Sequence, residues 1–198
     1  MASVPRFREE LALCPGSTFT GKCFRVVDLE TFLKNETPTL LFDLGPKIEK
    51  GGQRFSPPGD HRGLYVSAEA ATAGAEFADG LKNWDLGRCS KHVTFDMDVC
   101  LASALDLTNP SVRRTLHTSK REIQSAWMGG RALNGGIQPP TWSLGHEAFA
   151  SGRFDGILFP STKNPNGACL LIFTERLLSG RTHVIIHKQN GTVWERLP

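Results

Sequence analysis

The sequence predicts an α+β domain in which helices pack about a bent or split β-sheet. Apolar runs of strand length predominate along the chain, and short segments of helical character are interleaved between them. Near the C-terminal end, two β-rich runs flank Asn190-Gly191, a dipeptide that favours a two-residue turn, so we expect a hairpin over residues 182–197. At 198 residues, the chain has the length of one domain with a single core.

We divide the chain into an irregular, proline-containing lead-in at residues 1–22 and one folded domain at residues 23–198. The clearest strand is His92–Val99, in which apolar and polar residues alternate strictly. Further strands are expected at Cys23–Asp28, Thr39–Leu44, Leu64–Val66, 154–161 and 167–173. Helices are expected at 29–36, from Ser67 as N-cap to Glu76, from Pro110 to Trp127, and after Ser143 as N-cap, with a long Gly- and Pro-rich loop at 128–141.

Charge and cysteine content argue against several classes of function. The formal net charge is +3, and the basic residues are scattered, which does not favour nucleic-acid binding. Five cysteines with no C-x-x-C pair and no metal-ligand spacing indicate reduced, mostly buried thiols and no metal site. The first residues lack the apolar run of a signal peptide, and no stretch approaches the roughly 20 apolar residues of a membrane span, so we expect neither a signal peptide nor a membrane anchor.

Several common catalytic motifs are absent from the sequence. It contains no G-x-x-x-x-G-K-[ST] phosphate loop, no G-x-G-x-x-G after a strand, no H-E-x-x-H and no G-x-S-x-G. These absences disfavour a P-loop NTPase, a standard dinucleotide dehydrogenase, a zincin and an α/β-hydrolase. His183 and His187 have no third ligand near them in the sequence, and we interpret them as core or surface histidines.

The stretch from Gly51 to Glu76 concentrates the candidate site residues. Two glycines and a Pro-Pro-Gly turn enclose Arg54, a short apolar strand contains Tyr65, and an alanine-rich helix ends on Glu76. Tyr65 lies 11 positions from Arg54 (65 − 54) and 11 from Glu76 (76 − 65), so a loop, a strand and a helix can bring a cation, an aromatic ring and a carboxylate to one cleft. Ser161 follows Pro160 at the end of another apolar run, where site residues often gather.

Each of these residues also has a structural interpretation. Arg54 can clamp a phosphate or carboxylate, or it can support the turn. Tyr65 in an apolar strand is more often a core residue, and Glu76 on an alanine-rich helix is by default exposed to solvent. Ser161 can be ordinary turn chemistry. The residues alone leave these alternatives open.

Three motifs in order resemble the RES domain family, which is named for its Arg, Glu and Ser. They are G-G-Q-R-F-S-P-P-G, then G-L-Y-V-S with the helix to Glu76, then F-D-G-I-L-F-P-S-T, and the resemblance covers roughly Cys23 to Phe173. Weaker similarities are F-R-V-V at the start, which makes Arg25 a candidate for substrate binding, L-D-L-T-N-P, and the T-W-S-L-G-H-E-A helix. The family is known from bacterial toxin–antitoxin systems and from some secreted antibacterial effectors.

The resemblance implies a fold similar to that of ADP-ribosyltransferase toxins, NAD+ as the substrate and no metal. The family's arginine, tyrosine, glutamate and serine fall on Arg54, Tyr65, Glu76 and Ser161. It implies that Glu76 acts at the nicotinamide ribose, that Arg54 holds the pyrophosphate and that Tyr65 flanks the nicotinamide. Ser161 would then bind the ribose region or orient Arg54.

The implied function is cleavage of the nicotinamide–ribose bond of NAD+, as a glycohydrolase or phosphorylase that depletes cellular NAD+. A mono-ADP-ribosyltransferase that modifies a target protein is the first alternative. A catalytically inactive nucleotide- or partner-binding module is the second. The implied partner is an antitoxin or immunity protein that covers the active site. We expect a cytoplasmic site of action, whether the protein is made in that cell or delivered by a secretion system.

Overall fold

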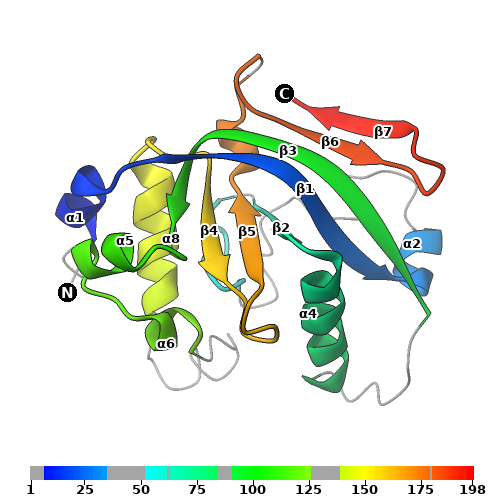
Figure 1. Cartoon of the computed structure of the whole chain (residues 1–198), viewed down its shortest axis with the longest axis horizontal. Coiled ribbons are helices and arrows are strands. Elements are labelled where there is room, and N and C mark those ends of the chain that lie inside the picture. Colours follow the sequence, from blue (N-terminus) through cyan, green and yellow to red (C-terminus); the bar gives the residue numbers. More distant parts are fainter. Residues whose placement is uncertain (1–6, 35–51, 62, 84–90, 126–138, 179) are drawn as a thin grey trace.

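The computed structural model describes residues 7–34, 52–61, 63–83, 91–125, 139–178 and 180–198, and they form a mixed α+β domain built on one sheet (Figure 1). The predicted fold class is therefore confirmed. The strands are β1 (Ser17–Asp28), β2 (Leu64–Ser67), β3 (His92–Asp106), β4 (Gly156–Pro160), β5 (Ala168–Ile172), β6 (His183–His187) and β7 (Val193–Leu197).

The order of the strands in the sheet is β1-β2-β5-β4-β3-β6-β7, and β1 also pairs with β3. That additional antiparallel pairing runs from Ser17 opposite Ala104 to Asp28 opposite His92, and Figure 1 shows the two long strands curving together across the molecule. The pairing closes β1, β2, β5, β4 and β3 into a ring. The hairpin of β6 and β7, joined around Asn190-Gly191 as expected, lies on the edge of β3 opposite β1, and β4 pairs with a later part of the same edge. The sheet is thus bent and split.

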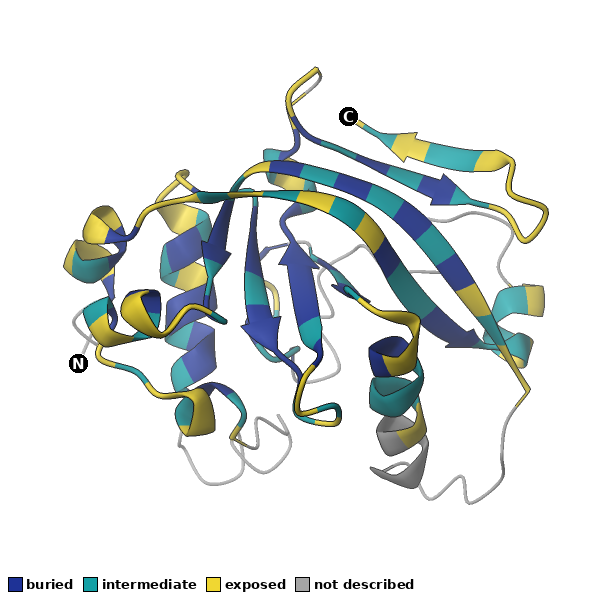
Figure 2. Ribbon diagram, viewed as in Figure 1, coloured by how far each residue is buried: buried dark blue, intermediate teal, exposed yellow. Residues whose placement is uncertain are grey.

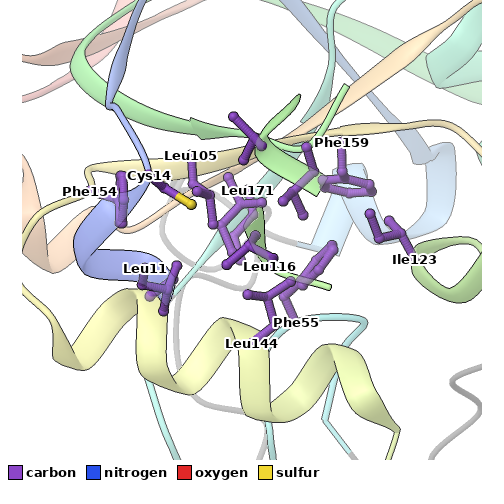
Figure 3. Close-up of a cluster of buried hydrophobic side chains, with 14 of the residues drawn as sticks. Leu11, Cys14, Phe55, Leu105, Leu116, Ile123, Leu144, Phe154, Phe159 and Leu171 are labelled. Atoms are coloured by element: carbon purple, nitrogen blue, oxygen red, sulfur yellow. The ribbon is translucent and has the colours of Figure 1, made fainter. Parts of the chain in front are cut away.

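Strand alternation creates two apolar clusters on opposite faces of the sheet. The strand-side cluster includes Phe95, Met97, Val99 and Leu101, the buried residues of β3 that alternate as predicted. The helix-side cluster lies beneath the helices at one end of the sheet, where Figure 3 shows Phe55, Leu144, Leu116 and Leu171 meeting. β5 serves both clusters because its successive side chains point to opposite faces: Leu170 and Ile172 join the first, and Leu171 joins the second.

The helices gather in two groups. Figure 1 places α1 (Arg8–Leu13), α5 (Pro110–Thr115), α6 (Lys120–Ile123) and α8 (Pro140–Ala150) at one end of the sheet, and α2 (Leu29–Lys34) and α4 (Ala70–Asn83) at the other. A 3-10 turn, η1, spans Thr174–Arg176. Figure 2 shows that the buried residues of α8 face the sheet. Among the described residues, no helix has the length and apolar character needed to cross a membrane.

Within residues 7–22, the described part of the predicted lead-in, the expectation of irregular structure was wrong. Helix α1 lies there, and β1 begins at Ser17, six residues before the expected strand. Phe7, Leu11 and Cys14 are buried in the helix-side cluster, so tertiary packing holds a segment whose local composition is polar. The first half of β1 alternates between exposed and half-buried residues, and its partner β3 supplies the order that its own sequence does not.

The helix expected from Pro110 to Trp127 is two short helices, α5 and α6. Both Leu116 and Ile123 are buried, and His117 between them adopts a positive φ of 48°, which ends the first helical segment. Ser119 then caps α6 by accepting a hydrogen bond from the backbone N–H of Glu122 at 3.1 Å. Trp127 lies outside the described residues.

Two predicted N-caps were also wrong. Ser67 is the last residue of β2, and α4 begins at Ala70. Helix α8 begins at Pro140 rather than after Ser143, because a proline fits the first turn of a helix without losing a hydrogen bond. The expected strand Thr39–Leu44 and most of the loop at 128–141 lie outside the described residues.

Candidate active site

Glu76 meets the turn that follows β4. The carboxylate oxygen Oε1 accepts hydrogen bonds from the Ser161 hydroxyl at 2.6 Å, the Thr162 backbone N–H at 3.1 Å and the Thr162 hydroxyl at 3.4 Å. The apolar strand β4 ends at Pro160, so the next two residues turn toward helix α4. Within the described part of the chain, every hydrogen bond to this carboxylate goes to Oε1, which leaves Oε2 as the oxygen able to take a ligand.

The turn that carries Ser161 is itself fastened to α4. Ser161 is 1% exposed, and its hydroxyl oxygen accepts the backbone N–H groups of Lys163 and Asn164 at 3.1 and 3.0 Å. The Asn164 amide donates to the hydroxyl of Thr72 on α4 at 2.8 Å. A Cβ at Gly167 would lie 2.1 Å from the Thr72 hydroxyl oxygen, so a glycine is required for this close approach. The serine and the carboxylate therefore sit on one rigid unit.

Arg54 lies on the opposite wall, in the loop between Gly52 and Pro58. Its Nη1 donates to the backbone carbonyls of Ile123 at 2.7 Å and Ser125 at 3.1 Å. Burial lowers the pKa of Arg54, and the negative charge of Glu76 is the largest influence acting against that shift. The charge of Glu76 therefore acts on Arg54, and the guanidinium retains donors for an anionic ligand.

Tyr65 is hydrogen-bonded to the loop that carries Arg54. It lies on β2, and its hydroxyl accepts the backbone N–H of Phe55 at 3.0 Å and shares a hydrogen bond with the Ser56 hydroxyl at 3.1 Å. The ring packs against the helix-side cluster, 6.4 Å from the ring of Phe159. Burial raises the pKa of Tyr65 to about 12, so the phenol stays protonated at neutral pH.

Arg25 lies next to Tyr65 in the structure. It extends from β1, and its Nη1 donates to the Tyr65 backbone carbonyl at 2.7 Å. Burial lowers its pKa, and its Nε is buried without a hydrogen-bond partner among the described residues. The structure therefore brings Arg54, Tyr65, Glu76 and Ser161 into one region, with Arg25 adjoining it.

Sequence reasoning missed several residues at this site. Thr162 contributes a backbone N–H, Gln124 donates to the Ser161 carbonyl at 2.5 Å, and the Cys169 thiol lies 3.9 Å from Glu76 Oε1. Burial, followed by the nearby charge of Glu76, raises the pKa of Cys169 to about 12, so this thiol is neutral. A backbone donor and a core cysteine leave no motif, so no local signal could have identified them.

The histidines singled out in the sequence do not form a metal site. His187 on β6 pairs with Asp98 on β3 at 2.8 Å, apart from the candidate site. Among the described residues, no group of three or more His, Cys, Asp or Glu side chains could hold a metal ion.

Comparison with known proteins identifies the family of this chain. A model of the RES domain family matches residues 24–193, most of the chain, and the protein belongs to that family. A search of curated proteins found no match. A chain in the crystal structure of the M. tuberculosis MbcT–MbcA toxin–antitoxin complex is similar in fold, with a TM-score of 0.61, 15% identity, and coverage of 96% of this chain and 90% of that chain.

Proposed function

We propose that this protein is an NAD+-consuming toxin or effector that cleaves the bond between nicotinamide and ribose. The observation that carries this proposal is a single carboxylate, on Glu76, oriented by three neutral donors on one oxygen and near enough for its charge to act on the Arg54 guanidinium. Membership of the RES domain family supports the same assignment.

Cleavage of the nicotinamide–ribose bond is served by a site with one preorganised carboxylate. Nicotinamide leaves NAD+ as a neutral pyridine, so the leaving group needs no strong general acid. The ribose develops positive charge as the bond breaks, and a preorganised carboxylate stabilises that charge more than it stabilises the ground state. In the proposal, the free oxygen of Glu76 faces the ribose while Ser161 and Thr162 hold the other oxygen.

The remaining residues would bind and orient the dinucleotide. Arg54 would hold a pyrophosphate oxygen with the donors that it does not give to Ile123 and Ser125. Tyr65 would flank the nicotinamide with its ring, while its hydroxyl stays bonded to the Arg54 loop. Arg25, hydrogen-bonded to the Tyr65 backbone carbonyl, would add positive charge for the phosphates.

Incubation of the purified protein with NAD+ tests this proposal. The expected result is stoichiometric loss of NAD+ and release of nicotinamide by the wild type, and collapse of both in Glu76→Gln. The matched control is Glu9→Gln, which neutralises an exposed carboxylate on α1. The reaction is run in buffers with and without phosphate and with candidate acceptor proteins, because the product separates hydrolysis, phosphorolysis and transfer of ADP-ribose to a protein.

No loss of NAD+ from folded wild-type protein under any of these conditions would contradict the proposed activity. In that case, retained binding of NAD+ by both wild type and Glu76→Gln would favour the non-catalytic binding module.

We further propose an antitoxin or immunity protein that covers the site. A similar fold occurs in the MbcT–MbcA toxin–antitoxin complex, and a cell that makes an NAD+-consuming enzyme must restrain it. The test is co-expression with proteins encoded next to this chain, followed by copurification and measurement of NAD+ loss. An inhibitory partner should bind less tightly to an Arg54→Ala variant than to an Arg8→Ala control on the exposed face of α1.

A further inference from the structure

A continuous line of hydrogen bonds runs behind the arginine loop. The Phe55 N–H donates to the Tyr65 hydroxyl at 3.0 Å, which lies 3.1 Å from the Ser56 hydroxyl. The Ser56 oxygen lies 3.1 Å from His61 Nε2, and His61 Nδ1 lies 2.9 Å from an oxygen of Asp60. The line joins the residue next to Arg54 to a buried histidine.

The chemistry of its two ends gives this line one direction. A carboxylate accepts hydrogen bonds, so Asp60 requires a proton on His61 Nδ1, and the neutral ring then presents Nε2 as an acceptor. Ser56 must therefore donate to His61, and the Tyr65 hydroxyl must donate to Ser56. The Phe55 N–H at the other end can only donate, which agrees with this order. Every hydroxyl in the line makes both of its bonds.

Protonation of His61 would break that order. A proton on Nε2 turns this atom into a donor to the Ser56 oxygen. Either Ser56 keeps accepting from Tyr65 and its own hydroxyl proton loses its acceptor, or Ser56 turns to donate to Tyr65 and the Tyr65 proton loses its acceptor. In both cases one hydroxyl proton in a partly buried place is left unpaired, which is unfavourable. The unprotonated histidine is thus part of the geometry that holds Phe55 and Ser56 in position.

The surroundings of His61 favour the neutral ring. The residue is 2% exposed and is stacked on Phe149 with ring centroids 4.8 Å apart, and the edge of Phe173 lies 4.9 Å away. Burial lowers the pKa of His61, and its bond to Asp60 acts against that shift. The other titratable or charged groups that face it are His146 from α8, Glu175 from η1, and Arg176, whose guanidinium lies 4.7 Å from the Phe149 ring centre.

Helix α8 holds the same loop from its other side. The Trp142 indole N–H donates to the Gln53 carbonyl at 2.8 Å, and His146 lies 3.1 Å from Asp60. A Cβ on Gly145 would lie 1.7 Å from the Phe55 carbonyl oxygen, so the helix backbone touches the loop backbone. Arg54 is therefore held between residues that are each fixed by a buried contact.

The order Ser56, His61, Asp60 has the connectivity of a nucleophilic triad, but its surroundings do not suit one. Ser56 is 7% exposed, and its oxygen already accepts the Tyr65 hydroxyl. A nucleophile must reach its substrate, and this hydroxyl lies beneath the loop. This line of hydrogen bonds is suited to hold the Arg54 loop in position rather than to supply a nucleophile.

We propose that Ser56, His61 and Asp60 are positioning residues that set Arg54 and Tyr65 for catalysis, and that the site assembles fully only while His61 is neutral. This inference rests on the proposed function for its kinetic consequences. Its structural core, the coupling of Tyr65 to the charge on His61, stands apart from it.

Two variants of His61 separate the hydrogen bond from the packing. His61→Gln keeps an acceptor for Ser56 but does not titrate, whereas His61→Phe keeps the stacking on Phe149 and Phe173 but offers no acceptor. We expect His61→Phe to lose at least about tenfold in kcat/KM at neutral pH and His61→Gln to lose distinctly less. We expect kcat/KM of the wild type to fall as the pH drops below the pKa of the folded protein's His61, which lies beneath its ordinary value of about 6.5, and this acid limb to be absent in His61→Gln.

Tyrosine NMR provides a readout that does not depend on activity. The chain contains one tyrosine, so protein labelled with ¹³C at the tyrosine ring gives a single signal that belongs to Tyr65. We expect this signal to shift as the wild type is acidified through the titration of His61, and to stay constant in His61→Gln. A Tyr65 signal that is constant in the wild type, or that moves equally in both proteins, would overturn the inference. If wild-type protein leaves NAD+ intact while the tyrosine signal behaves as expected, the proposed function fails and the coupling remains.

Discussion

The two walls of the candidate site are held by different chemistry. On one wall, Glu76 takes its hydrogen bonds from a serine hydroxyl and a backbone N–H, which are neutral across the pH range of cells. On the other, the loop around Arg54 depends on a histidine that must stay neutral and on direct contact with α8. The donors that hold the carboxylate thus do not titrate, whereas the support of the arginine loop includes a histidine that does. In the proposed mechanism, Glu76 therefore acts through its charge, whereas the loop acts by holding Arg54 in position.

The largest effect is expected on the carboxylate wall. Glu76→Gln removes the charge that faces the ribose but keeps the shape of the side chain, so turnover should fall about a hundredfold or more, near 3 kcal/mol in the barrier. Affinity for NAD+ should change much less, because the charge acts mainly in the transition state. Steady-state kinetics together with calorimetric binding of NAD+ measure the two. An equal loss of binding and turnover would mean that Glu76 is a binding residue.

The next largest effect is expected on the arginine wall, as a change in the free energy of unfolding. Gly145→Ala forces a Cβ against the Phe55 carbonyl, and the overpacking should lower the free energy of unfolding by about 2–3 kcal/mol. Urea denaturation measures this change. Gly74→Ala on α4 is the matched control: no atom lies within 4 Å of its new Cβ, so it should instead stabilise the protein by about 0.5–1 kcal/mol. Equal effects of the two substitutions would contradict the close contact between helix and loop.

A smaller effect is expected from loosening Glu76. Ser161→Ala removes the 2.6 Å hydrogen bond to Oε1 and should lower kcat about tenfold, since the carboxylate keeps the Thr162 N–H. Thr162→Val, which removes the longer 3.4 Å contact and leaves that N–H in place, should cost less than about threefold. Measurement of kcat for both variants ranks the two donors. The reverse ranking would show that the serine acts elsewhere, for example on the substrate.

The smallest effect is the acid response of stability. The pKa of His61 is lower in the folded protein than its ordinary value of 6.5, so the unfolded chain binds the proton more readily. The stability that the neutral ring contributes is fully present above about pH 6.5 and declines as the pH falls toward the folded-state pKa. Denaturation of the wild type and of His61→Gln at several pH values isolates this part. The same decline in both proteins would assign it to other groups.

Local pattern predicted much of the fold. The alternation in β3, the apolar runs of β4 and β5 and the Asn190-Gly191 turn all gave strands where the structure has them. These predictions succeeded because side-chain alternation follows directly from the geometry of a strand. They failed at α1 and at the break between α5 and α6, where burial of residues such as Leu11 and Leu116 outweighs local preference.

The candidate site was likewise predicted from the sequence only in part. Spacing and family motifs indicated Arg54, Tyr65, Glu76 and Ser161, because a loop, a strand and a helix in succession have few ways to converge. The sequence did not indicate the support of these residues by His61, Trp142 or the carbonyls of Ile123 and Ser125. Backbone groups and buried polar side chains form no recognisable pattern until the chain has folded.

By itself, then, the sequence determined the class of fold and most of the described strands, and it indicated four residues of the candidate site. The tertiary structure decided which atoms meet: β1 closing on β3, Ser161 reaching Glu76 across 85 positions, and a histidine directing the hydroxyl of the single tyrosine. Strand and turn preferences act between near neighbours and can be read along the chain. Hydrogen-bond partners are set by the packing of distant segments, which the order of residues encodes only through the whole fold.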